Sequence, residues 1–208
     1  MLNNPILSGG IAGLVEVSLT HPLDYMKVSI QQNKKIVIRE FYRGILSRYT
    51  SVFPMRGILW GCRKQGKKHL KNSSFLQKSG AIGGVAGFLQ TFVDAPLENI
   101  KIQRMYYNKV NYQPYYLTRG FVPNMARNMI LCSGIIGGSF IDHPFGLLAG
   151  SFIGCVASQP FDYIKTIRQS GIKPNYNHIM SGWYYRAMIT PINMYIGYHV
   201  YKFLTRIE

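Results

Sequence analysis

The sequence is poor in acidic residues and in charge altogether. Its 208 residues contain 8 aspartates and glutamates against 24 lysines and arginines, which gives a formal net charge of +16. Charged residues make up 15% of the chain, well below the roughly one quarter usual for soluble domains. With 47% hydrophobic residues and 21 glycines, the composition suits closely packed membrane helices. It favours a membrane protein that meets anionic lipid and anionic solutes, and it disfavours the alternative of a basic nucleic-acid-binding protein.

Patterns typical of enzymes and metalloproteins are missing as well. The 3 cysteines (Cys62, Cys132 and Cys155) are widely spaced and are interpreted as small buried apolar residues. The 5 histidines follow no ligand spacing, and there is neither a Ser/His/Asp constellation nor a phosphate-binding glycine loop. We therefore expect no enzymatic activity, no metal and no cofactor. We also expect no cleavable signal peptide, since no basic region precedes the first apolar stretch.

The few acidic residues are concentrated in one motif that occurs three times. A proline is followed two residues later by an acid and, three residues after that, by a lysine. The copies are Pro22, Asp24 and Lys27; Pro96, Glu98 and Lys101; and Pro160, Asp162 and Lys165. An acid and a base three residues apart lie on nearly the same face of a helix. Because each copy ends a glycine-rich apolar stretch, the motif predicts three equivalent helices.

The three motifs predict a gate made of ion pairs. A charge on an apolar helix in a bilayer is costly unless it faces a protein interior, a water-filled cavity or a partner. Each proline should bend its helix, and Asp94 is expected to cap the segment that restarts after the second bend. We expect the acid of each copy to reach the lysine of the next, in the pairs Asp24–Lys101, Glu98–Lys165 and Asp162–Lys27.

The threefold motif resembles the signature of the mitochondrial carrier family. Gln31 and Gln169 stand nine residues after their prolines, where the family has a glutamine that braces the ion pair, whereas repeat two has Met105 there. The sequences Tyr-Arg-Gly at 42–44 and Thr-Arg-Gly at 118–120 are similar to the family's aromatic-basic-glycine element before each even-numbered helix. The resemblance covers nearly the whole chain. The connections are short, as in carrier-like proteins encoded by large DNA viruses.

The resemblance implies a fold and a location. We expect an all-α membrane protein with one carrier domain over 1–208, divided into repeats at 1–73, 74–142 and 143–208. Six transmembrane helices should surround a central cavity with pseudo-threefold symmetry. We expect them over residues 5–32, 47–65, 75–105, 120–140, 145–169 and 182–204. The family resemblance further implies a multi-pass monomer in the mitochondrial inner membrane, with the gate on the matrix side and anionic lipid such as cardiolipin as a partner.

Substrate-contact positions on the even-numbered helices are also implied by the resemblance. They fall on Ser51 in repeat one and on Arg127 and Asn128 in repeat two. Arg127 is the strongest candidate because a guanidinium group matches phosphate or carboxylate, although it could instead pair with Glu16. Glu16 lies only about 20° around its helix from Lys27 and should face the lumen. It is either a charge satisfied by a neighbouring arginine or an acid that orients substrate or couples protons.

The outer mouth departs most from the family. There the even-numbered helices normally carry acids, but the second helix of this chain ends in bases, and Asp142 is the only nearby acid. These bases are Arg63, Lys64, Lys67 and Lys68. Like charges repel, so we expect a weakly closed outer gate and a resting state open to the outside.

The function implied is transport of small anionic metabolites by alternating access. The net charge, the basic mouth and the viral resemblance favour nucleotides, deoxynucleotides included. The Arg-Asn pair at 127–128 favours the alternative of a carboxylate or keto-acid carrier. A second alternative is a decayed carrier that no longer transports and remains as a membrane protein.

Overall fold

The computed structural model describes residues 4–31, 38, 41–42, 45–70, 74–107, 112–141, 143, 145–170 and 183–205. Within these ranges, the side chains of residues 23–31, 47, 101–107, 116–117, 166–167, 169–170 and 185 fall outside the description.

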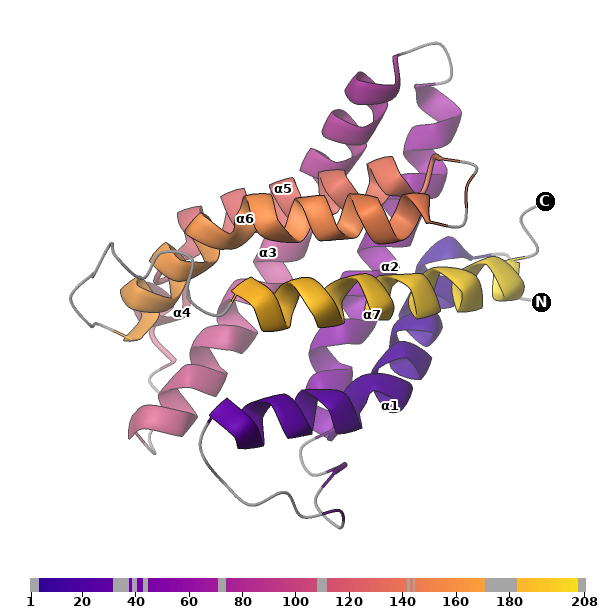
Figure 1. The fold of residues 1–208 in the computed structure, drawn as a ribbon. Helices are drawn as coiled ribbons and strands as arrows, with labels where there is room; N and C mark the ends of the chain where they lie inside the picture. Colours follow the sequence, from indigo (N-terminus) through magenta and orange to yellow (C-terminus); the bar gives the residue numbers. More distant parts are fainter. Residues whose placement is uncertain are drawn as a thin grey trace.

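The described residues form helices and no strand. The long helices are α1 (Pro5–Gln31), α2 (Ile45–His69), α3 (Phe75–Tyr107), α5 (Phe121–Gly138), α6 (Gly146–Ser170) and α7 (Trp183–Thr205), and the short α4 (Pro114–Leu117) precedes α5 (Figure 1). These bounds lie within a few residues of the predicted ones, so the all-helical, six-helix prediction is confirmed. No helix in the described ranges combines the length and the apolar character needed to cross a membrane. The pseudo-threefold symmetry and the repeat boundaries stay predictions.

The six long helices pack as a closed ring. Each contacts the next long helix along the chain, and α7 returns to contact α1. Figure 1 shows α7 lying between α6 and α1, with the beginning of α1 and the end of α7 at the same end of the molecule. The ring therefore has an interior toward which every long helix can direct side chains.

The motif prolines lie within continuous helices. Pro22, Pro96 and Pro160 are inside α1, α3 and α6, and α1 visibly changes direction along its length (Figure 1). Because α3 runs through Pro96 without a break, no new helix begins there. The prediction that Asp94 caps a restarting segment is therefore wrong.

Glycines set how closely neighbouring helices approach. A Cβ atom on Gly134 of α5 would lie 2.5 Å from the Gly150 carbonyl oxygen and 2.8 Å from the Gly154 Cα, both on α6. A Cβ atom on Gly9 of α1 would lie 2.7 Å from the Arg56 carbonyl oxygen of α2. Since real Cβ atoms do not approach so closely, these contacts require glycine, as the spacing of small residues predicts.

One turn places α5 and the arginine that it carries. Gly120, just before α5, has φ 77°, in the left-handed region where glycine avoids the steric cost of a side chain. The Asn99 side-chain amide donates to the Arg119 carbonyl oxygen at 3.1 Å and to the Ala95 carbonyl at 3.0 Å. The turn is thereby tied to α3, which fixes the start of α5 relative to its neighbour.

An apolar core fills part of the ring. Trp60 of α2 and Tyr201 of α7 are fully buried and stack with ring centroids 5.3 Å apart. Tyr198 contacts the same indole at 5.3 Å. All six long helices contribute to this one cluster, for example through Ala12, Leu59, Ile82, Ile135, Leu147 and Met194.

Candidate functional site

Each of the three helix hairpins places one arginine of its second helix against one acid of its first. Arginine is suited to this arrangement because its planar fork can donate two parallel hydrogen bonds to a carboxylate. All three arginine side chains are largely buried, with at most 15% of their surface exposed. The pairs are Arg56–Glu16, Arg127–Asp94 and Arg186–Asp162.

The first pair joins α2 to α1. Arg56 donates from Nε to Glu16 Oε2 at 2.8 Å and from Nη2 to Oε1 at 2.5 Å, which is a two-bond contact. Glu16 is 1% exposed, and α7 passes so close that a Cβ atom on Gly197 would lie 2.5 Å from Glu16 Oε2. Arg56 is therefore the neighbouring arginine that satisfies the charge of Glu16. The alternative that Glu16 pairs with Arg127 does not hold, because Arg127 contacts Asp94 and Asp162.

Arg127 of α5 is held between two acids on different helices. Its Nη2 donates to Asp94 Oδ2 of α3 at 3.1 Å, and its Nη1 donates to Asp162 Oδ1 of α6 at 3.0 Å. Its Nε and Nη2 also reach the Oδ1 atom of Asn128 at 3.1 and 2.7 Å. Arg127 thus joins the second hairpin to the third inside the ring.

Asp94 holds this arginine in place. Its Oδ2 accepts from the side-chain amides of Asn124 at 3.0 Å and Asn128 at 3.3 Å, in addition to Arg127. Asn128 also donates to Thr91 Oγ1 at 3.1 Å. A buried carboxylate satisfied by several donors keeps its charge and its geometry. The structure therefore gives Asp94 a positioning role that the sequence did not reveal.

Arg186 of α7 completes the set. Its Nη1 lies 3.3 Å from Asp162 Oδ2. Its Nη1 also donates to Gln159 Oε1 and its Nη2 to Ser158 Oγ, each at 3.2 Å. No role for Arg186 was predicted, although an arginine within a mostly apolar stretch was a signal that an internal partner exists.

Of the predicted gate pairs, the structure brings together Glu98 and Lys165, which form an ion pair. Asp162 meets two arginines, as described above, and its predicted partner Lys27 has no described side chain. The same holds for the other gate residues, Asp24, Gln31, Lys101 and Gln169. The gate roles, including those of the three prolines, stay predictions.

Ser51, predicted as a substrate contact, lies on α2, and its hydroxyl hydrogen bond is not part of the arginine–acid network. Its hydroxyl donates to the Arg48 carbonyl oxygen of its own helix at 3.0 Å. Of the four predicted substrate contacts, the structure places Arg127 and Asn128 in one network, Glu16 in a separate pair and Ser51 in neither. Their contact with substrate stays a prediction.

At the opposite end of the interior, Arg63 is buried, whereas the sequence predicted that it belongs to a cluster of repelling bases at the outer mouth. It is 5% exposed and donates to Ser139 Oγ at 2.6 Å, to the Ser139 carbonyl at 2.9 Å and to the Tyr198 hydroxyl at 3.2 Å. Its guanidinium carbon also lies 5.1 Å from the Tyr198 ring centroid and 5.5 Å from that of Phe140. The prediction that Arg63 adds to a repelling cluster is therefore wrong, because neutral acceptors and aromatic faces hold it inside.

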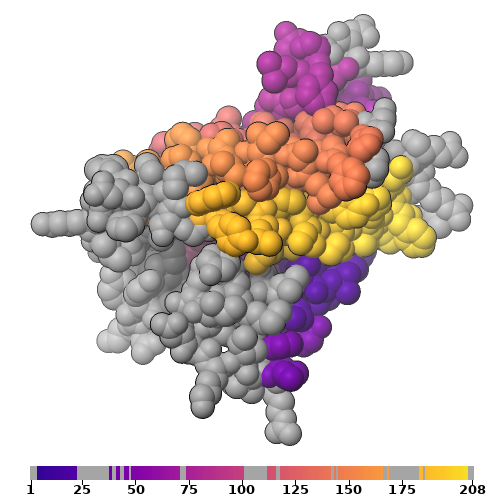
Figure 2. All heavy atoms as spheres, viewed as in Figure 1, coloured from indigo at the N-terminus to yellow at the C-terminus, as the bar shows by residue number. Residues whose placement is uncertain are grey.

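The three lysines of that predicted cluster, unlike Arg63, lie at the surface. Lys64, Lys67 and Lys68 are exposed, near where the end of α2 and the start of α3 project past α6 (Figure 2). Arg63 meanwhile ties α2 to α7 and to the end of α5. The structure joins these helices where the sequence predicted a weakly closed mouth.

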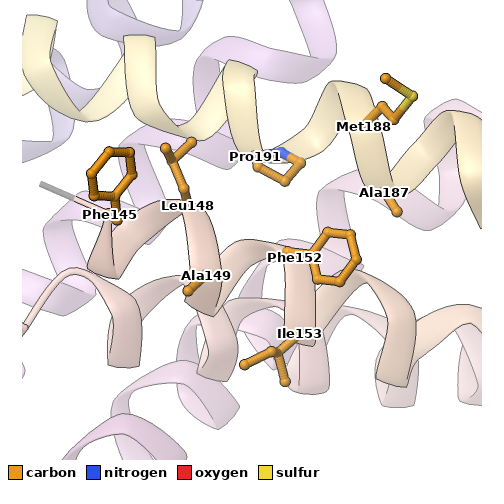
Figure 3. Close-up of a pocket in the computed structure, with 8 residues that line it drawn as sticks. All are labelled: Phe145, Leu148, Ala149, Phe152, Ile153, Ala187, Met188 and Pro191. Atoms are coloured by element: carbon orange, nitrogen blue, oxygen red, sulfur yellow. The ribbon is translucent and has the colours of Figure 1, made fainter.

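A pocket on the outside of α6 and α7 offers no polar chemistry (Figure 3). Its lining is entirely apolar, so it is no candidate for binding an anion. The lining residues are Phe145, Leu148, Ala149, Phe152, Ile153, Ala187, Met188 and Pro191.

Comparison with known proteins agrees with the repeated motif. The chain is 26% identical to the probable mitochondrial 2-oxodicarboxylate carrier of Schizosaccharomyces pombe, over 88% of this chain and 79% of that protein. The chain is thus similar, over most of its length, to a member of the mitochondrial carrier family. No family model matches it.

Other relatives of this chain point the same way. It is 22% identical to the mitochondrial dicarboxylate carrier of Caenorhabditis elegans, over 91% of this chain and 84% of that protein. It is 25% identical to a mitochondrial carrier-like protein of Acanthamoeba polyphaga mimivirus, over 60% of this chain and 54% of that protein. These relatives are named as carriers rather than as enzymes. Mitochondrial carriers are multi-pass proteins of the inner membrane, and this carrier shares that location.

Proposed function

We propose that this carrier moves small dicarboxylates, including 2-oxodicarboxylates, across the mitochondrial inner membrane by alternating access. The observation that supports this most is the set of three interior arginines, one on each of α2, α5 and α7. Guanidinium groups bind carboxylates through paired, charge-assisted hydrogen bonds. An interior that already matches each of these groups with a carboxylate has the right chemistry to receive a substrate of the same kind.

The names of the relatives support the same substrate class. Those from S. pombe and C. elegans are named for 2-oxodicarboxylates and dicarboxylates. Nucleotides, which the charge of the sequence favoured, have no support among these names. We therefore adopt the carboxylate alternative and keep nucleotides as an outcome of the test.

We further propose that the threefold motif closes the matrix side of six membrane-spanning helices with pseudo-threefold symmetry. The ion pair between Glu98 and Lys165 supports this, because it joins the acid of the second motif to the lysine of the third. The closed ring of six helices supports it as well. Arg127 and Asn128 are the proposed substrate contacts. The carrier would act as a monomer in contact with anionic lipid such as cardiolipin.

The test is uptake of labelled 2-oxoglutarate, succinate and dATP by proteoliposomes, with protein-free liposomes as the control. We expect the two dicarboxylates to enter faster than in the control and dATP not to. Uptake of dATP alone would replace the dicarboxylate assignment by the nucleotide one. No uptake of any of them by correctly inserted protein would favour the alternative of a carrier that has lost transport.

A further inference from the structure

Asp162 lies between two arginines that come from different helices. Its Oδ1 accepts from Arg127 of α5 at 3.0 Å, and its Oδ2 lies 3.3 Å from Nη1 of Arg186 of α7. One carboxylate therefore bridges two guanidinium groups, with one oxygen directed at each. This is the arrangement in which a two-arginine site would bind the carboxylate of a ligand.

Both arginines have other anchors. Arg127 is held by Asp94 and Asn128, and Arg186 is held by the side chains of Gln159 and Ser158. The Nη1 atoms of both arginines lie close to the same carboxylate, although Nη1 of Arg186 also donates to Gln159 and Nη1 of Arg127 also lies 4.0 Å from Glu98. The two-arginine site is therefore organised by groups other than Asp162.

Asp162 is also more accessible than the neighbouring acid. Its side chain is 26% exposed, whereas that of Asp94 is 6% exposed. Asp94 has amide donors as well as Arg127, so it is fixed in the scaffold. Asp162 can leave its place without uncovering a deeply buried carboxylate, and a ligand from water can reach the same place.

We propose that Asp162 is an internal stand-in for the substrate, occupying a carboxylate site made by Arg127 and Arg186 until a substrate carboxylate displaces it. The proposal rests on the proposed function, since it takes the substrate to be a dicarboxylate. It assigns Arg186 as a second substrate-binding arginine beside Arg127. The free Asp162 carboxylate then becomes available to the ion pairs of the motif region, so that substrate binding and rearrangement of the gate are coupled through one side chain.

The proposal predicts that removing the internal carboxylate strengthens binding while it harms transport. An internal competitor lowers the apparent affinity by the fraction of time that it occupies the site. In purified protein, we expect Asp162→Asn to bind 2-oxoglutarate about tenfold more tightly than the wild type, measured by isothermal titration. Uptake of the same compound by proteoliposomes should fall, because the variant lacks the group that transmits binding to the gate. Asp162→Ser serves as a second variant if the asparagine form does not fold.

Two further variants separate displacement from a general change of charge. Glu98→Gln removes the same charge at a group 4.0 Å from Arg127 without vacating the two-arginine site. We expect its gain in affinity to be less than half that of Asp162→Asn. Arg186→Gln should abolish the gain when it is combined with Asp162→Asn, because half of the proposed site is then missing.

Each outcome decides something different. If the wild type binds 2-oxoglutarate but Asp162→Asn binds it equally or more weakly, the stand-in proposal is overturned and the proposed function stands. Equal gains in Glu98→Gln, or a gain that survives Arg186→Gln, would also overturn it. If the wild type binds dATP instead, the substrate class is wrong, and the same comparison with dATP decides the role of Asp162. If neither the wild type nor Asp162→Asn binds any of the anions tested, both proposals fail.

Discussion

Arg127 is held by acids on two helices other than its own, and this governs what its replacement does. Arg127 contacts Asp94 of α3 and Asp162 of α6 while it belongs to α5. A change at such a residue removes a possible substrate contact and also a link between hairpins. The size of a guanidinium group and its planar fork can therefore be tested apart from its charge.

Arg127→Lys should keep the fold and lose most transport. Lysine preserves the positive charge near Asp94, but it cannot donate to two carboxylates in fixed directions. We expect dicarboxylate uptake to fall roughly tenfold or more, with little change in melting temperature. Arg127→Ala should in addition lower stability by about 3–5 kcal/mol, since it strands a buried carboxylate. Arg119→Lys, at an exposed position in the turn before α5, is the control. Full uptake by Arg127→Lys would show that the fork is not used.

The pair of Glu16 and Arg56 should behave as one unit. Both side chains are largely buried, with 2% and 15% of their surface exposed. Glu16→Gln or Arg56→Gln alone leaves a charge without its partner and should destabilise the protein by about 3–5 kcal/mol, whereas the double variant should lose less than the sum. Thermal unfolding of the four proteins in detergent measures this coupling. Additive losses would mean that the two charges do not depend on each other.

At the scale of helices, the contact between α5 and α6 depends on glycine at matched positions. Gly134 faces the backbone of α6 at Gly150 and Gly154. The side-chain hydrogen of glycine is what allows two backbones to approach to this distance. The interface should therefore tolerate no added methyl group, whereas glycines that face open space should.

Gly134→Ala tests this requirement. The new Cβ atom would lie 2.5 Å from the Gly150 carbonyl oxygen, so the helices must separate, at a cost of about 1–3 kcal/mol. Gly80→Ala in α3 is the matched control, because its Cβ would meet nothing within 4 Å. That control should be neutral or slightly stabilising, since alanine is the better helix former. Melting temperatures that change equally in both variants would contradict the packing argument.

The sequence predicted the helices well and the contacts between them less well. Periodic motifs, glycine spacing and turns such as Gly120 are local signals, so the positions of the six long helices followed from them, whereas the short α4 was not predicted. Arg63 shows the limit: its neighbours Lys64, Lys67 and Lys68 suggested a repelling cluster, but only the packing of α2 against α5 and α7 reveals its neutral partners. Asp94 was misread for the same reason, because its amide donors come from α5.

On the scale of the whole molecule, Arg63 joins helices that are not neighbours in the ring. It connects α2 with Ser139, which follows α5, and with Tyr198 of α7. These contacts lie beside the stacked pair of Trp60 and Tyr201, so the apolar core and this hydrogen-bonded group close the same end. Opening that end requires the Arg63 contacts to separate.

Arg63→Ala should make this opening easier. We expect Cys132, which is 2% exposed, to react several-fold faster with a water-soluble maleimide in a background with Cys62 and Cys155 changed to serine. Lys64→Ala, one residue further along α2 and exposed, should leave the rate unchanged. Equal labelling rates for Arg63→Ala and Lys64→Ala would mean that Arg63 does not hold this end closed.

The balance of charge among the ion-paired residues of the ring has an electrical consequence. Among the ion-paired residues, four described acids are matched by four bases: Glu16, Asp94, Glu98 and Asp162 with Arg56, Arg127, Lys165 and Arg186. Arg63 lies apart from them, against Ser139 and Tyr198. These paired residues add no net charge to a bound anion, so the proposed dicarboxylate would pass them with both of its negative charges. A voltage of 100 mV shifts the free energy of that movement by about 2.3 kcal/mol per charge, or about 4.6 kcal/mol for a dianion. One-way entry into a negatively charged compartment is then strongly opposed. For the proposed dicarboxylate cargo, exchange of one dianion for another would move no net charge and would avoid this cost.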